Sequence, residues 1–140
     1  GSVPHDGARA YQGKSLLPVA RGDTNLQHEA IFAEMTYHVK YTPMRAIRTR
    51  EFKYIENLND EPAGLDMCED FEWAQRVAEL PDQPCCRPRP PEELYYLPDD
   101  PNEEANLADD SAFAQKKEEL IYRLHNWRRE TDDPLPIEES

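Results

Sequence analysis

Three short segments within residues 30–58 have the residue pattern of β-strands, and their spacing restricts the possible folds more than any other feature of the chain. Residues 30–38 alternate in polarity, which is typical of a strand. Residues 44–50 and 52–58 follow, and only a tight turn around Arg50 and Glu51 separates them. Such spacing predicts an antiparallel hairpin, preceded by one further strand.

The first of these strands has two different faces, because side chains alternate along a strand. Its apolar face carries Ile31, Ala33, Met35 and Tyr37. Its polar face carries Glu34, Thr36 and His38. Phe32 interrupts the polar face near its start. We therefore expect both faces to be partly covered.

The rest of the chain predicts further elements. Helical spacing of apolar residues indicates a helix at 69–80 and a long one at about 111–130, with Asp109 or Asp110 as its N-cap. Five prolines in 81–91 predict an extended linker. The remaining predictions are a short helical turn that Pro18 ends, a strand at 92–97, a turn at 98–102 and a brief helical turn at 103–108.

These elements predict an α+β fold in which a small antiparallel sheet of three to four strands has a long C-terminal helix packed on one face. We expect residues 1–29 to form an irregular lead-in, residues 30–134 the domain itself and residues 135–140 a loose tail. Hydrophobic residues make up 38% of the chain, so the core should be thin.

Charge is distributed unevenly along the chain. Residues 1–58 contain eight basic and six acidic residues, a net charge of +2, and residues 59–140 contain eight basic and twenty-three acidic residues, a net charge of −15. Such acidity argues against nucleic-acid binding, which requires a basic surface, and against an anionic membrane surface. An anionic ligand would have to approach the first half of the chain.

The cysteines predict neither a disulfide nor a metal site. They are Cys68, Cys85 and Cys86, an odd number with two adjacent members. We interpret them as reduced thiols, which favours a cytoplasmic location without fixing the compartment. No zinc-ligand spacing accompanies them, and we expect no metal ligands in this chain.

Catalytic motifs are missing from the sequence. It has no Gly-rich phosphate loop and no GxSxG element. Acidic pairs such as 99–100, 109–110 and 132–133 lie at turns or helix ends, where Asp binds its own backbone. His125 is interpreted as a histidine on the surface of the long helix.

The predicted hairpin is the segment with a candidate binding role. His38 ends the first strand, shares a face with Thr36 and precedes a basic stretch that includes Arg45. Two interpretations stay open for these basic residues. They can form a solvated hairpin face, or a surface that faces an anionic ligand or a partner domain.

Two stretches of the chain resemble the C-terminal region of sulfatases, in particular those related to N-sulfoglucosamine sulfohydrolase (heparan N-sulfatase). PMRAIRTREFKYI at 43–55 is similar to the family pattern P-M-R-x-[IV]-[RQ]-x-x-x-[FY]-[KR]-x-[IV]. ELYYLPDDPNEEANLA at 93–108 and WRRETDDP at 127–134 are similar to the family's E-L-Y-D-L-x-x-D-P-x-E-x-x-N-L-A block and W-x-x-E-T-x-D-P ending. QGKSLLP at 12–18 resembles the segment that leads out of the catalytic domain. Tyr96 replaces a frequent family Asp, and 85–91 has no counterpart.

The resemblance implies an accessory domain of an alkaline-phosphatase-like hydrolase that cleaves sulfate esters or sulfamates. Such enzymes use a formylglycine made in a C-x-[PA]-S-R motif and a calcium ion, both in the N-terminal catalytic domain. The nearest local string, Cys86-Arg87-Pro88-Arg89, lacks the serine and is not such a site. This chain alone is therefore expected to be inactive and to bind its catalytic domain.

By the same resemblance, the turn from His38 to Arg45 is expected to reach the rim of the substrate pocket and to bind a sulfated sugar or other small sulfated molecule. The expected substrate-binding residues are Thr36, His38, Tyr41 and Arg45. Two alternatives remain, a stand-alone module for sulfated glycans and an oligomerisation module in which the isolated chain self-associates through an apolar face.

Overall fold

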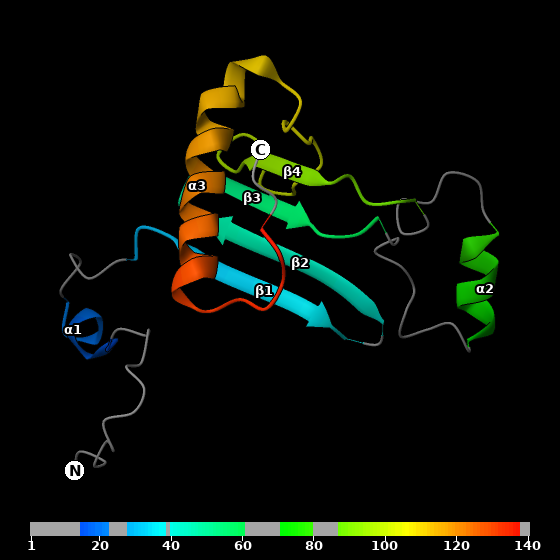
Figure 1. The fold of residues 1–140 in the computed structure, drawn as a ribbon, viewed down its shortest axis with the longest axis horizontal. Coiled ribbons are helices and arrows are strands. Elements are labelled where there is room, and N and C mark those ends of the chain that lie inside the picture. Colours follow the sequence, from blue (N-terminus) through cyan, green and yellow to red (C-terminus); the bar gives the residue numbers. More distant parts are fainter. Residues whose placement is uncertain (1–14, 23–27, 39, 61–70, 80–86, 138–140) are drawn as a thin grey trace, which may run out of the picture.

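The computed structural model describes residues 15–22, 28–38, 40–60, 71–79 and 87–137, and the structural findings concern these residues. Figure 1 shows two layers, a twisted antiparallel sheet and one long helix, α3, lying across one of its faces. This arrangement confirms the predicted α+β architecture.

The sheet has four strands in the order β1-β2-β3-β4, so every neighbour in the sheet is also the neighbour in sequence. All three pairings are antiparallel. A backbone bond from Thr49 N to Phe52 O, 2.8 Å long, closes the predicted turn around Arg50 and Glu51. The strands are β1 (Ile31–Tyr37), β2 (Tyr41–Arg48), β3 (Phe52–Asn57) and β4 (Glu92–Tyr96).

The helices differ greatly in length. A short α1 spans Leu17–Ala20, α2 spans Glu72–Ala78, and the 3-10 turn η2 at Ser111–Phe113 leads into α3 at Ala114–Glu130. Asp110 caps η2, the turn that leads into the long helix, since its Oδ1 accepts a hydrogen bond of 2.9 Å from Ala112 N. The N-cap of α3 itself is Phe113, which makes no side-chain capping bond. None of the described helices is both long and apolar enough to cross a membrane.

A row of cross-strand partners forms the core beneath α3. Phe32 pairs with Ile47, Ile47 with Tyr54, and Tyr54 with Leu94, so these side chains share one face of the sheet. Leu120 and Leu124 of α3 complete the buried cluster. Each fully buried apolar side chain stabilises the fold by about 1.5–3 kcal/mol.

Trp127 extends this contact to the edge strand β1. Its ring stacks on that of Phe32 with centroids 5.0 Å apart and the planes 4° from parallel. The residue that interrupts the polar face of the first strand in sequence is therefore the one that attaches β1 to α3.

The opposite face of the sheet is crossed by none of the described helices, because α1 and α2 lie beyond the two ends of the sheet in Figure 1. Ile31 and Tyr37 on that face are 57% and 68% exposed. Their neighbours Met35, Met44 and Ile55 are only half-buried. A single-layer covering thus leaves an apolar sheet surface open.

Three local predictions were wrong. Residues 103–108 form no helical turn, and Glu103 instead has a positive φ of 59°. The second strand begins at Tyr41 rather than 44, since Pro43 lies where the register between β1 and β2 shifts, a position at which a strand tolerates proline. Pro18 does not end a helical turn but occupies the first turn of α1, where its fixed φ suits a helix.

The tail that was predicted to be loose is attached at its start. The carbonyl oxygens of Leu135 and Pro136 accept hydrogen bonds from Arg128 Nη2 at 3.2 and 2.7 Å. Residues 138–140, most of 1–29 and all three cysteines lie outside the described residues. The remaining domain boundaries stay predictions.

Candidate functional site

The end of the β1–β2 hairpin is the most exposed polar and aromatic surface among the predicted site residues. Tyr37 and Tyr41, which pair across the hairpin, are 68% and 52% exposed, and His38 is exposed beside them. His38 N donates to the Lys40 carbonyl at 3.2 Å. Imidazole and phenol groups presented this way can donate hydrogen bonds to an anionic or hydroxyl-rich ligand.

Tyr41 is attached to the next strand connection through its backbone. Its carbonyl oxygen accepts a hydrogen bond of 3.0 Å from Asn59 Nδ2. The backbone at this end of β2 is therefore held, while the Tyr41 side chain remains available to solvent.

Arg45 occupies a different environment from His38 and Tyr41, because its side chain is only 1% exposed. Nε and Nη2 donate to the two carboxylate oxygens of Asp133 at 2.7 and 2.9 Å. Nη1 donates to the carbonyls of Met35 and Met44 at 3.0 and 2.8 Å, and Nη2 also donates to Thr36 Oγ1 at 3.1 Å. All five N–H groups of the guanidinium thus have acceptors within the protein.

Thr36 and Arg45 are therefore brought together, and they lie beneath the exposed hairpin end. Of the four predicted site residues, His38 and Tyr41 reach solvent, Thr36 is half-buried and Arg45 is enclosed. The structure thus divides the set into two groups, one that can contact a ligand and one that supports the backbone carrying it.

Asp133 joins this hairpin to the C-terminal segment. Its side chain is 1% exposed and accepts hydrogen bonds from both Arg45 and Arg128. Leu135 N also donates to Asp133 Oδ1 at 3.1 Å. The hydrogen bond from Arg45, together with these donors, holds the pKa of the Asp133 carboxyl well below its usual range despite burial. The same bond raises the pKa of Arg45.

Arg128 and His125 carry the network on to β3. Arg128 is fully buried, donating from Nε to Asp133 Oδ2 at 2.9 Å and from Nη1 to Glu56 Oε2 at 2.6 Å. His125 Nε2 lies 3.0 Å from Glu56 Oε1. The interpretation of His125 as a surface residue was therefore wrong, since it is only 9% exposed.

The sequence does contain a signal for these two buried polar residues. Arg128 follows Leu124 by four positions and His125 follows Ile121 by four, so both lie on the packed side of the helix. Polar residues at positions that continue an apolar stripe indicate buried hydrogen-bonded groups. The burial of Arg128 and His125 follows from that spacing.

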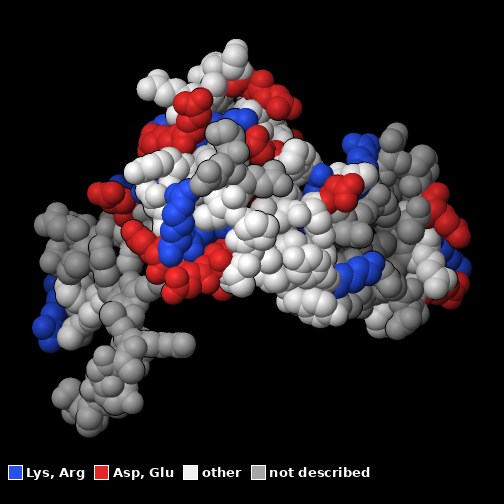
Figure 2. Space-filling model, in the orientation of Figure 1, with Lys and Arg blue, Asp and Glu red and all other residues white. Residues whose placement is uncertain are grey.

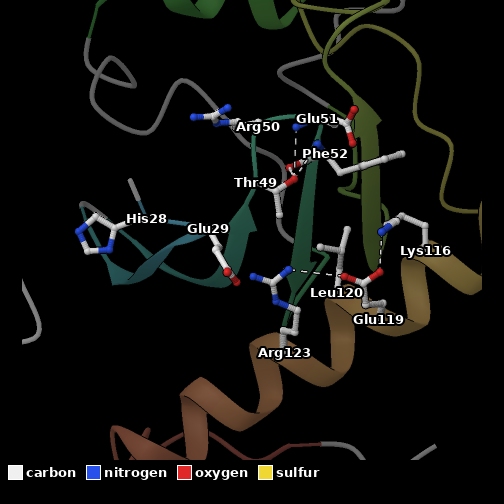
Figure 3. A pocket seen from close by; sticks show the side chains of 10 residues that line it. All are labelled: His28, Glu29, Thr49, Arg50, Glu51, Phe52, Lys116, Glu119, Leu120 and Arg123. Atoms are coloured by element: carbon white, nitrogen blue, oxygen red, sulfur yellow. Dashed lines mark hydrogen bonds and ion pairs between the residues drawn. The ribbon is translucent and has the colours of Figure 1, made fainter. Parts of the chain in front are cut away.

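A cavity of about 470 Å³ lies at the other end of the sheet, around the β2–β3 turn (Figure 3). Phe52 and Leu120 line its apolar part. Lys116 and Arg123 of α3 both pair with Glu119, at 2.5 and 3.5 Å. The lining also contains Arg50, Glu29 and Glu51, so three basic groups face three carboxylates and the cavity lacks a concentrated positive field.

A second cavity of about 640 Å³ lies between β3, the start of β4 and the C-terminal segment. Glu56, Asp60 and Glu92 give its lining an acidic character, and Arg89 adds one positive group. Glu56 and Glu92 pair with Arg128 and Lys117 at 2.6 and 2.8 Å. Among the described residues, no group of three or more His, Cys, Asp or Glu is placed to hold a metal ion.

The charge distribution over the surface also distinguishes the hairpin end. Figure 2 shows acidic side chains gathered over the upper and left parts of the sheet layer. The surface over the right-hand ends of β1 and β2 is largely uncharged in the same view. A sulfated ligand would meet less repulsion there than elsewhere on this face.

Comparison with curated proteins identifies two sulfatases as relatives. The chain is 32% identical over 139 residues to human N-sulphoglucosamine sulphohydrolase, a match covering 87% of this chain and 27% of that protein. It is 27% identical over 147 residues to an ulvan-active sulfatase of Formosa agariphila, covering 96% of this chain and 27% of the relative. No protein-family model matches the chain.

Solved structures share the fold. A 2-O GAG sulfatase superposes with a TM-score of 0.61 at 24% identity, covering 99% of this chain and 24% of the larger one. A second structure, solved in complex with its substrate D-glucosamine-2-N,6-O-disulfate, gives a TM-score of 0.59 at 21% identity and covers 99% and 23% of the two chains. The present chain spans about a quarter of the length of each relative.

Proposed function

We propose that this chain, a homologue of sulfatases over nearly its whole length, is the C-terminal accessory domain of a sulfatase and forms part of the rim of its substrate pocket. The observation that carries the proposal is the exposed hairpin end at His38 and Tyr41, which lies on a buried ionic network within a sulfatase-like fold. Its partner is the catalytic domain of the same enzyme.

The open face of the sheet supports packing against that domain. Ile31 and Tyr37 are exposed beside the half-buried Met35, Met44 and Ile55. A contiguous apolar surface of this kind is costly in water and marks a contact surface. The relatives are about four times as long as this chain, so each contains ample further protein to cover such a face.

The hairpin end supplies the ligand contacts in this proposal. The His38 imidazole donates to a sulfate or sugar oxygen, and the Tyr41 phenol adds a donor and a ring face for a sugar. Thr36 and Arg45 act beneath them, since Arg45 uses all five of its donors within the protein. The ligand class is a sulfated sugar or another small sulfated molecule.

The catalytic groups are placed outside this segment in our proposal. The family resemblance implies a formylglycine and a calcium ion in the N-terminal catalytic domain. We therefore assign the steps of sulfate hydrolysis to that domain. The contribution of this chain is to bind and orient the substrate beside the group that attacks sulfur.

A stand-alone sulfated-glycan module or a self-associating module is the alternative function, and the exposed sheet face is compatible with the second. The net charge of −13 opposes the first, because a sulfated polymer is itself strongly negative. Retention of the 140-residue chain on a heparin column at low salt would favour the glycan module. Passage through the heparin column without retention, together with concentration-dependent dimerisation in solution, would favour self-association.

The test of the proposed function compares this chain with the full-length protein that contains it. Turnover of an aryl sulfate and of N-sulfoglucosamine is expected only from the longer protein. In that protein, His38→Ala is expected to raise KM for the sulfated sugar at least tenfold. His28→Ala, at the opposite end of the sheet, serves as the control and is expected to leave KM unchanged. An unchanged KM in His38→Ala would remove the hairpin end from the substrate site.

A further inference from the structure

The end of β1 is not fixed by regular strand pairing. Met35 pairs with Met44, but Tyr37 pairs with Tyr41, so the register between β1 and β2 shifts between Met35 and Tyr37. A shift of this kind interrupts the ladder and leaves the local backbone with fewer constraints. Thr36, between these two pairs, has no register partner, so the backbone that leads to Tyr37 and His38 depends at this point on contacts other than the ladder.

Arg45 provides these contacts on the interrupted strand. Its Nη1 donates to Met35 O at 3.0 Å, and its Nη2 donates to Thr36 Oγ1 at 3.1 Å, directly before the residues where the register shifts. The guanidinium is planar and rigid, so its orientation determines where these two acceptors are held. Arg45 therefore holds Met35 and Thr36 in place next to the register shift, and we call this set of contacts the Arg45 bracket.

The orientation of that bracket is set by a residue from the other end of the domain. Asp133 accepts two parallel hydrogen bonds from Arg45, at 2.7 and 2.9 Å, in a site where both side chains are 1% exposed. A bidentate pair fixes the plane of the guanidinium as well as its position. In this placement every N–H donor of Arg45 has an acceptor.

From this geometry we infer that Asp133 is a positioning residue for the substrate-binding hairpin, acting through Arg45 and Thr36 on the backbone that carries His38. The inference rests on the proposed function for its catalytic consequence, but its structural part is independent of that function. The C-terminal segment after α3 thereby sets the shape of the pocket rim.

The same network contains a built-in control. Glu56 binds Arg128 and His125, at 2.6 and 3.0 Å, and fastens α3 to β3, while none of the interactions described for it involves β1. Glu56 is also the cross-strand neighbour of Arg45 and its charge acts on the guanidinium, but none of the five hydrogen bonds of Arg45 goes to it. Glu56→Gln therefore removes a charge from the buried network and leaves the hydrogen bonds from Arg45 to β1 and to Asp133 in place. Asp133→Asn keeps the size of the side chain and removes the charge that holds Arg45.

The first experiment measures amide hydrogen exchange in the 140-residue chain by NMR. We expect Asp133→Asn to speed exchange at Thr36 and His38 at least tenfold more than at Tyr54 in the central strand. Glu56→Gln is expected to change these two sites by no more than it changes Tyr54. Equal effects of both variants at the hairpin and at Tyr54 would reduce Asp133 to a general stabilising residue and overturn the inference.

If Asp133→Asn does not fold, Thr36→Val tests whether the contact from Arg45 positions the hairpin end. It removes the acceptor for one bond from Arg45 and leaves the buried ion pair in place. Faster exchange confined to the amides of position 36 and His38 is expected, by about threefold or more. A hairpin that exchanges as in the wild type would overturn the inference without any need for the more disruptive variant.

The second experiment measures kinetics in the longer protein. Asp133→Asn is expected to raise KM for the sulfated sugar several-fold with little change in kcat, and Asp133→Glu, which keeps the carboxylate, is expected to restore part of the loss. If His38→Ala raises KM but Asp133→Asn does not, the positioning inference fails and the proposed function stands. If exchange at the hairpin responds to Asp133→Asn but neither variant changes KM, the proposed function fails.

Discussion

Asp133 and Arg45 are separated by 88 positions in sequence and meet in a bidentate ion pair, with Arg45 Nε 2.7 Å from one carboxylate oxygen of Asp133 and Nη2 2.9 Å from the other. The pair joins β2 to the segment that follows α3. Both partners have further hydrogen bonds, so neither charge is left unsatisfied in the interior.

Removing the Asp133 carboxylate should destabilise the domain strongly. Asp133→Ala leaves two buried guanidinium groups without their shared anion, and breaking a buried pair in this way costs about 3–5 kcal/mol. Urea unfolding followed by circular dichroism is the measurement. Asp132→Asn, one position away and exposed, is the control, because Asn tolerates the positive φ of 53° at this position, and a comparable loss in both variants would show that the ion pair is not the cause.

The contribution of Asp133 to the free energy of unfolding should decrease as the pH is lowered. The pKa of Asp133 is lowered on folding, chiefly by the hydrogen bond from Arg45, so the unfolded chain binds the proton more readily than the folded one. The contribution is therefore complete above the ordinary Asp pKa of about 3.9 and declines as pH falls toward the folded value. The stability difference between wild type and Asp133→Asn should be constant from pH 5 to 7 and shrink below pH 4. A difference that grows in acid would contradict the assignment.

Local sequence patterns predicted most of the fold. The alternating polarity of β1, the tight turn at Arg50 and Glu51 and the Asp110 cap each depend on neighbours within a few residues. The helical spacing of apolar residues that predicted α3 includes Leu120 and Leu124, which are buried. These features are recoverable from sequence because short-range geometry determines them.

The site depended on contacts that no local pattern contains. The alternation in β1 did not reveal that α3 covers the face with Phe32 rather than the face with Ile31, because that choice depends on the partners Ile47 and Tyr54 in other strands. Arg45 was expected at a ligand-facing surface, and its buried environment depends on Asp133 near the other end of the chain. Glu103 has a left-handed backbone conformation and forms ion pairs with Lys53 and Arg48. Neither partner is near Glu103 in sequence.

The stacked pair of Phe32 and Trp127 should be the main apolar attachment of β1 to α3. Phe32→Leu keeps most of the buried area but removes the ring contact, and such aromatic pairs contribute about 0.5–1.5 kcal/mol beyond area. We expect a loss of about 1 kcal/mol by chemical unfolding and a changed Trp127 fluorescence in a Trp73→Phe background. Phe71→Leu, in the separate aromatic contact on α2, should leave the Trp127 signal as it was.

Asn106 should stabilise the outer edge of the sheet through three side-chain bonds. Its Oδ1 accepts from Leu94 N at 2.9 Å and from Ala108 N at 3.0 Å, and its Nδ2 donates to the Glu92 carbonyl at 3.0 Å. The amide thereby takes the place of a fifth strand along part of β4, which would otherwise expose unpaired backbone groups.

The substitution Asn106→Ala should therefore cost about 1–2 kcal/mol, since the bonds are near solvent and water replaces part of them. Asn106→Asp also loses the donation to Glu92, and its second oxygen is repelled by the Glu92 carbonyl, but its first oxygen still accepts from Leu94 N and Ala108 N. Hydrogen exchange at Leu94 N should speed in Asn106→Ala and stay slow in Asn106→Asp. Faster exchange in both variants to the same degree would mean that the loop, rather than the Asn106 side chain, protects the edge of β4.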